Sequence, residues 1–193
     1  LGRGGRGKTI MLDLQATDTP MAARDSQALA QIDGNIAVLS SMLSGYAVEH
    51  MGFLVHSRTP LLLQRGMAGP EDEAKYPLKA ATQQEANNFL GIMQRRRICV
   101  LHFMGPSSGT VKLLPLLPGD GEEQEGEDED EEEDEDAVER PEEVRLVAKP
   151  GQMLVFLCNQ YEFTYTAAGD SVVLQAWFLD NPPDFVIAGP VSG

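Results

Sequence analysis

An acidic run between two strand-like stretches most constrains how this chain can fold. Residues 120–143 hold 17 of the 30 acidic residues and only one of the 15 basic residues, Arg140. Such a segment buries no apolar surface and its charges repel one another, so we expect residues 119–143 to form a disordered acidic loop. Because loop-closure entropy grows slowly with length, a domain can carry this insertion between two strands.

Outside this run the chain is nearly neutral. The other residues hold 13 acidic and 14 basic side chains, a net charge of +1 compared with −15 for the whole chain. A domain this close to neutral gives no signal for nucleic acid. No apolar run reaches the roughly 18 to 20 residues that span a bilayer. We therefore expect neither a nucleic-acid nor a membrane partner, and a basic partner for the acidic loop stays an alternative.

The chain begins with a Gly/Arg-rich stretch, residues 1–8, which we expect to be a flexible terminus. An RNA contact by this stretch is a second interpretation. The chain starts without Met and without the apolar segment of a secretory signal. We expect a fragment or processed product from a reducing intracellular compartment, the cytoplasm first. Residues 9–118 and 144–185 are predicted to form one α+β domain.

The two cysteines, Cys99 and Cys158, lie in apolar stretches far apart in the sequence. No CxxC motif and no Cys/His cluster accompanies them, which argues against a structural zinc site. Buried free thiols in a reducing compartment are our interpretation, and a disulfide is the alternative.

Two helices are predicted in the first half of the chain. The first has Asp25 or Ser26 as its N-cap and Gly45 as its stop, with Gly34 inside it. Its apolar residues recur at steps of three and four, which favours packing on a sheet: Leu29, Ile32, Ile36, Leu39 and Leu43.

The second predicted helix begins with a capping box at residues 82–85 and leads into three arginines, residues 95–97. Its apolar face holds Ala86, Phe89, Leu90 and Met93. Arginines suit the C-terminal end of a helix, where they oppose its dipole and stay solvated. A phosphate or carboxylate site built from them is the alternative.

The remaining apolar runs read as strands. Residues 53–55 and 61–63 suggest strands or a hairpin, and residues 144–147 are predicted to pair with 153–157 across the Pro150-Gly151 turn. Because both of its faces are apolar, the run at residues 98–104 is predicted to be a central strand. Further strands are expected at residues 9–14, 110–117, 161–165 and 171–179, giving a sandwich or barrel flanked by helices.

Four segments of the second half have the same order and the same kinds of strand and turn residues as one known barrel. They are a buried strand at residues 97–103, a Gly turn and strand at 108–113, a Pro-Gly turn and strand at 147–156, and a closing strand at 171–178. Together they resemble the double-stranded β-helix of Fe(II)/2-oxoglutarate-dependent dioxygenases, in particular the prolyl-4-hydroxylase-like group. The resemblance implies a jelly-roll-like core with two flanking N-terminal helices and the acidic loop as an insertion.

The resemblance also implies a chemistry whose residues this chain lacks. That family holds iron with an HxD pair and a distal His, and grips 2-oxoglutarate with a basic residue. No HxD occurs here, and Asn87 and Asn88 lie where the pair is expected. Residues 161–164 read YEFT at the distal His position. Asp170 stands where the basic residue is expected, and an acid there would repel a carboxylate.

Other residues offer little to rebuild such a site. His50, His56 and His102 are interpreted as surface or satisfied core histidines, with His102 facing into the barrel as the second interpretation. Glu162 is the carboxylate nearest the distal position. It alternates along the strand with Tyr161 and Phe163, however, so it is expected on the face opposite to these aromatic residues. We therefore assign no catalytic residue, no cofactor-binding residue, no metal ligand and no cofactor.

A weaker resemblance covers most of the chain. The chain is similar to an N-terminal region that precedes ketosynthase domains in algal, dinoflagellate-type polyketide synthases. The similarity lies in residues 17–20, the strand with the three arginines at 95–97, and the closing strand with Trp177. It implies an accessory module of a larger synthase with flanking domains. Our hypothesis is thus a non-catalytic, degenerate oxygenase-like domain for interaction or scaffolding. The alternatives are an active Fe(II)/2-oxoglutarate oxygenase and an acidic-loop binder of basic proteins.

Overall fold

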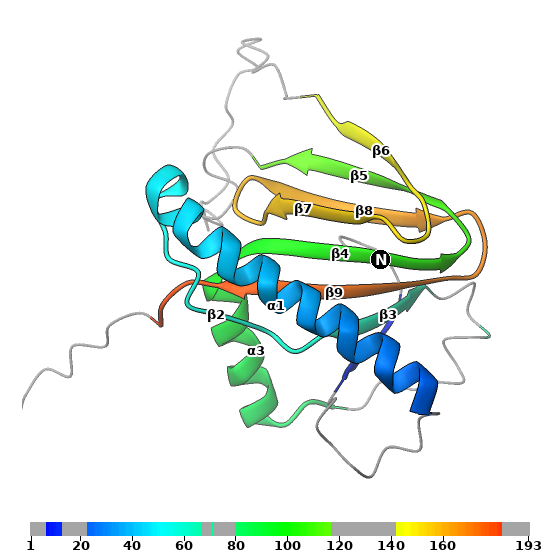
Figure 1. Cartoon of the computed structure of the whole chain (residues 1–193), viewed down its shortest axis with the longest axis horizontal. Helices are drawn as coiled ribbons and strands as arrows, with labels where there is room; N and C mark the ends of the chain where they lie inside the picture. The colour runs from blue at the N-terminus through cyan, green and yellow to red at the C-terminus, as the bar shows by residue number, and fades with distance from the viewer. Residues whose placement is uncertain (1–6, 13–22, 67–70, 72–79, 117–141, 183–193) are drawn as a thin grey trace, which may run out of the picture.

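The computed structural model describes residues 7–12, 23–66, 71, 80–116 and 142–182. This part of the chain forms antiparallel strands and two helices (Figure 1). The helices are α1 (Ala23–Met51) and α3 (Gln83–Arg95). The strands are β1 (Gly7–Met11), β2 (Ser57–Arg58), β3 (Leu62–Gly66), β4 (Arg96–Pro106), β5 (Gly109–Pro115), β6 (Val144–Ala148), β7 (Met153–Leu157), β8 (Tyr161–Ala167) and β9 (Ser171–Leu179).

The strands form two sheets. The larger has the order β1-β3-β9-β4-β7, with β2 also paired to β9, and the smaller has the order β6-β5-β8. Every pair is antiparallel. The expected mixture of helices and strands is thereby confirmed.

Strand β4 lies inside the larger sheet, between β9 and β7, as its two apolar faces predicted. Ile98 and Val100 belong to a core that includes Ile36 of α1. Cys99 and Leu101 belong to a second core, shared with side chains of β5 and β8. The alternation of one strand therefore supplies both cores.

Helix α1 crosses the outer face of the larger sheet (Figure 1). The predicted apolar stripe packs there, with Ile36 fully buried. The predicted ends were wrong, because the helix begins at Ala23 and runs through Gly45 to Met51. Fully buried Ala47 continues the packed face beyond Gly45, and such packing outweighs the roughly 1 kcal/mol that a helical glycine costs.

Two predicted strand pairings were also wrong. Strands β6 and β7 belong to different sheets, because the chain changes sheets at Gly151, which has a φ of 82° and donates its N–H to the Phe103 carbonyl. Residues 53–55 form no strand, and β2 and β3 each pair with β9 rather than with each other.

Several sequence-based expectations fall outside the described residues. They concern most of the Gly/Arg-rich terminus, the end of the first predicted strand and residues 119–141 of the acidic loop. Within the described part, neither helix is long and apolar enough to cross a membrane.

The turn between β4 and β5 gives a test of the packing. A Cβ on Gly109 would lie 2.5 Å from the Tyr165 ring and 2.6 Å from the Thr166 carbonyl oxygen. We expect Gly109→Ala to lower the free energy of unfolding by about 1–3 kcal/mol through overpacking. A Cβ on Gly34 would have no atom within 4 Å. Because alanine favours a helix more than glycine does, Gly34→Ala should raise the free energy of unfolding by about 0.5–1 kcal/mol. Denaturant unfolding of both variants checks this, and equal effects would contradict it.

Candidate functional site

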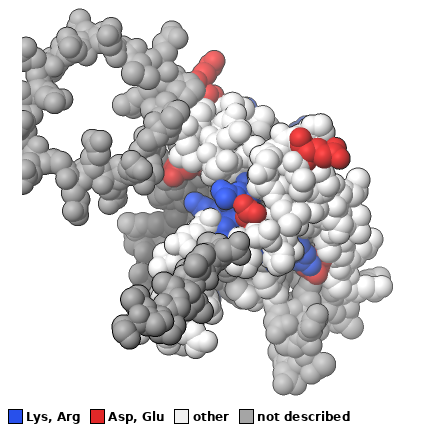
Figure 2. All heavy atoms as spheres, turned by 90° about the vertical axis from the view of Figure 1, so that its left-hand side faces the viewer, with Lys and Arg blue, Asp and Glu red and all other residues white. Residues whose placement is uncertain are grey.

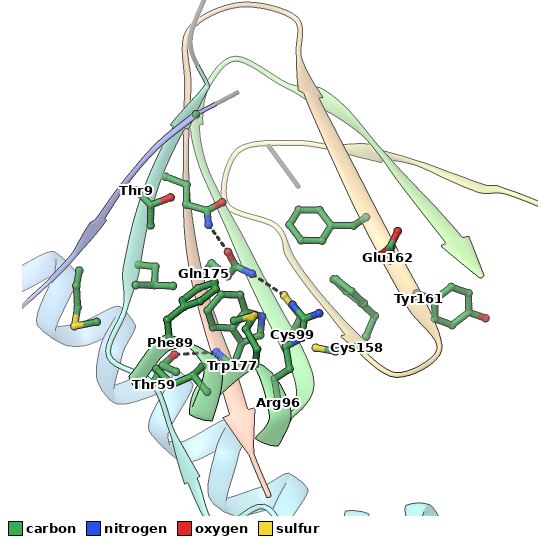
Figure 3. A pocket seen from close by; sticks show the side chains of 18 residues that line it. Thr9, Thr59, Phe89, Arg96, Cys99, Cys158, Tyr161, Glu162, Gln175 and Trp177 are labelled. Atoms are coloured by element: carbon green, nitrogen blue, oxygen red, sulfur yellow. Dashed lines mark hydrogen bonds between the residues drawn. The ribbon is translucent and has the colours of Figure 1, made fainter. Parts of the chain in front are cut away.

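A cavity of about 540 Å³ opens on the inner face of the larger sheet. Its floor includes a row of three residues paired across strands, Trp177 of β9, Cys99 of β4 and Phe156 of β7. One end of α3 and the start of β8 supply further walls (Figure 3). The lining also includes polar side chains from several segments: Thr9, Thr59, Gln64, Arg96, Cys158, Glu162 and Gln175.

A bulge at the start of β4 sets the position of Arg96. Arg96 pairs with Leu179 and Ile98 with Phe178, so Arg97 is an extra residue. In a regular strand Arg96 would share the face of Ile98, which packs in the core beneath α1. The bulge breaks this alternation, and Arg96 lines the cavity instead.

The other two arginines of the run are held on Asp180. Arg97 Nε donates to the Asp180 carboxylate at 3.0 Å, and Arg95 Nε donates to the Asp180 carbonyl at 2.9 Å. Figure 2 looks onto this end of the molecule and shows basic side chains beside acidic ones. The three arginines therefore do not form a single anion site, because two of them are bonded to Asp180 and only Arg96 lines the cavity.

A chain of hydrogen bonds crosses the cavity floor. The Gln64 amide donates to the Gln175 side-chain oxygen, and Gln175 Nε2 donates to the Cys99 sulfur at 3.3 Å (Figure 3). Gln175 is only 2% exposed. Both ends of its buried amide are thus satisfied within the fold, as buried polar groups require.

The two cysteines lie together at this floor, although they are far apart in the sequence. Phe156 pairs with Cys99, and Cys158 is the second residue after Phe156. The Cys158 N–H donates to the Arg97 carbonyl at 2.8 Å. Both thiols are free, which agrees with the sequence interpretation. Cys158 is only partly buried, however, unlike Cys99.

The surroundings push the two thiols in opposite directions. Burial raises the pKa of the Cys99 thiol well above its ordinary value. A hydrogen bond from Cys99 lowers the pKa of Cys158, and the positive charge of Arg96 acts in the same direction. Because the thiolate is the nucleophilic form of cysteine, we expect Cys158 to be the more reactive of the pair.

None of the three histidines lines the cavity. His50 lies on α1 with its ring 4.4 Å from that of Tyr46, and His56 is exposed after α1. His102 pairs with Leu174 of the core beneath α1, so it lies on the opposite face of β4 from Cys99. Burial lowers the pKa of His102, and the inward orientation considered from the sequence was wrong.

The donors on the cavity wall do not fit an iron(II) site of two imidazoles and a carboxylate. Glu162 is the only carboxylate among the described lining residues, and no imidazole accompanies it. Asp170, at the position expected for the basic residue, pairs with exposed Arg65 at 3.2 Å. Throughout the described ranges, no group of three His, Cys, Asp or Glu side chains is placed to hold a metal.

Sequence reasoning missed the cavity residues that matter most here. Nothing in the spacing of Cys99 and Cys158 indicates their contact, because the contact depends on the β4–β7 pairing. The strand at residues 153–157 was instead predicted to pair with residues 144–147. Strand alternation did contain one usable signal. It places Cys99, Leu101 and Phe103 on one face of β4 and His102 on the other.

Comparison with solved structures supports an oxygenase-like fold. A prolyl hydroxylase from Trichoplax adhaerens, solved with a peptide of the hypoxia inducible factor oxygen degradation domain, aligns at TM-score 0.52 and 13% identity. The alignment covers 93% of this chain and 66% of that protein, just under two thirds of its length. A Pseudomonas putida prolyl-4-hydroxylase aligns at TM-score 0.40 and 13% identity, over 91% and 72% of the two chains.

No protein-family model and no curated protein matches the sequence. At this low identity the likeness to the Trichoplax protein concerns the fold alone. The resemblance to polyketide synthase regions receives no support from the comparisons and stays a prediction.

The thiol pair gives a test of the site's electrostatics. We expect iodoacetamide to alkylate Cys158 before Cys99, because Cys158 is less buried and its pKa is lowered. Arg96→Gln removes a charge that favours the Cys158 thiolate, so its alkylation at a pH of about 7.5 should slow about threefold to tenfold. Peptide mass spectrometry over time measures both rates.

The matched control is Arg145→Gln, which removes an exposed arginine of β6 that does not line the cavity. It should leave both alkylation rates unchanged. Faster alkylation of Cys99 than of Cys158 in the unaltered protein would contradict the arrangement.

Proposed function

We propose that this chain is a non-catalytic domain on an oxygenase-like fold and that its role is binding. The observation that carries the proposal is the placement of its histidines. All three histidines of the sequence lie among the described residues, and none lines the cavity. A facial triad needs two imidazoles and one carboxylate, and the described cavity wall offers no imidazole.

Several of the polar groups that line the cavity are hydrogen-bonded within the fold. The Gln64–Gln175–Cys99 hydrogen bonds occupy the floor, and Thr59 Oγ1 accepts from the Trp177 N–H at 3.0 Å. Amide and neutral thiol groups of this kind are poor substitutes for the anionic and imidazole ligands of iron(II). This supports a domain that has an oxygenase-like fold but lacks the oxygenase reaction.

The binding role is supported by the cavity itself. Its volume falls in the range of small-molecule sites, roughly 300–1,000 Å³. Its wall is mostly apolar, with a few convergent polar groups, which is the usual composition of such sites.

The proposal is tested by iron(II) titration under anaerobic calorimetry, followed by incubation with 2-oxoglutarate and oxygen. We expect no stoichiometric iron binding and no succinate above the level of a protein-free control. Stoichiometric iron together with enzymatic succinate formation would overturn the proposal.

A variant with His50, His56 and His102 all changed to Ala serves as the matched control. Weak iron binding that is equal in this variant and in the unaltered protein comes from groups other than imidazole, and it supports the proposal when no succinate forms. Succinate formation that disappears in the variant would show that the histidines form an active site after all.

A further inference from the structure

Arg96 places a positive charge at the cavity that no described residue neutralises. Its two sequence neighbours are bonded to Asp180, whereas Arg96 makes no ion pair within the described ranges. The groups that its charge influences there are the thiols of Cys99 and Cys158, and Figure 3 shows all three side chains together. Neither cysteine is a permanent counter-charge of the kind that a carboxylate provides, so a partly desolvated guanidinium favours an anion from outside the fold.

Helix α3 forms the wall opposite the sheet, and its apolar side chains stay partly exposed. Helix α3 is well capped by Thr82 and Glu85, yet none of its residues is buried. Phe89 is 54% exposed, and it lines the cavity together with Ile92 and Met93. Helices normally bury one apolar face, so this face has apolar surface that a ligand can cover.

The charges on the wall limit the ligand to one anionic group. Arg96 is the only Lys or Arg among the described lining residues. A second anionic group on the ligand would therefore find no further cation among these lining residues. A small dicarboxylate would also leave the side chains of α3 uncovered.

We propose that the cavity binds an apolar monocarboxylic acid, with the carboxylate at Arg96 and the hydrocarbon part against α3 and Trp177. This inference deepens the proposed binding role and rests on it. The planar guanidinium fits a carboxylate with two parallel hydrogen bonds, and burial of the hydrocarbon supplies the remaining affinity.

Trp177 is the only tryptophan of the chain and lines the cavity, so its fluorescence reports on occupancy. Decanoate is the probe, and it is titrated below its micelle concentration with calorimetry in parallel. We expect a saturable change in fluorescence with decanoate, weaker binding of decanol and no response to 2-oxoglutarate. Arg96→Gln should weaken decanoate binding about 10- to 100-fold, while decanol binding stays the same.

Arg96→Lys keeps the charge and should restore part of the affinity, and Arg145→Gln should bind decanoate like the unaltered protein. Melting temperatures show whether each variant is folded. Equal binding of decanoate and decanol, unchanged decanoate binding by folded Arg96→Gln, or no response to decanoate would each overturn the inference. Iron-dependent succinate formation would instead overturn the non-catalytic role, so the two failures are separable.

Discussion

The structure depends on the alternation of β4, because this strand separates the two cores. Its residues Ile98 and Val100 pack beneath α1, while Cys99, Leu101 and Phe103 face the smaller sheet. A shift of one residue would exchange the two sets. The bulge at Arg97 ends this regular pattern, and the side chain just before it reaches the cavity rather than the core under α1. The same strand thus fixes the packing and places the charge of the site.

Local signals predicted local structure well. The capping box at Thr82 and Glu85 is present, and the apolar stripe from Leu29 to Leu43 packs on the sheet as expected. The end of α1 was misjudged because Gly45 is a weak helix breaker when buried Ala47 follows it. Sequence patterns show which residues prefer a helix, but they do not show how far tertiary packing extends it.

Pairing between distant segments was harder to predict. The sequence contains the strands of β6 and β7 and the turn between them, but a short turn between two strands is also typical of a hairpin. Whether the strands pair or separate into two sheets is decided by contacts with β4 and β5, which lie far away in the chain. The site was difficult to predict for the same reason, since Cys158 lies near Cys99 only because β4 pairs with β7. The absence of an HxD motif could be read directly, because the motif consists of three consecutive residues and does not depend on the fold.

Hydrogen bonds within the fold satisfy the buried polar groups of the cavity floor. A buried amide without partners would cost about 1–3 kcal/mol. Here Gln175 accepts a hydrogen bond from Gln64 and donates one to Cys99, so the floor is satisfied internally. Arg96 is the exception, since its charge has no partner among the described residues. The hydrogen bonds of the floor therefore leave Arg96 as the group on which the proposed ligand selectivity rests.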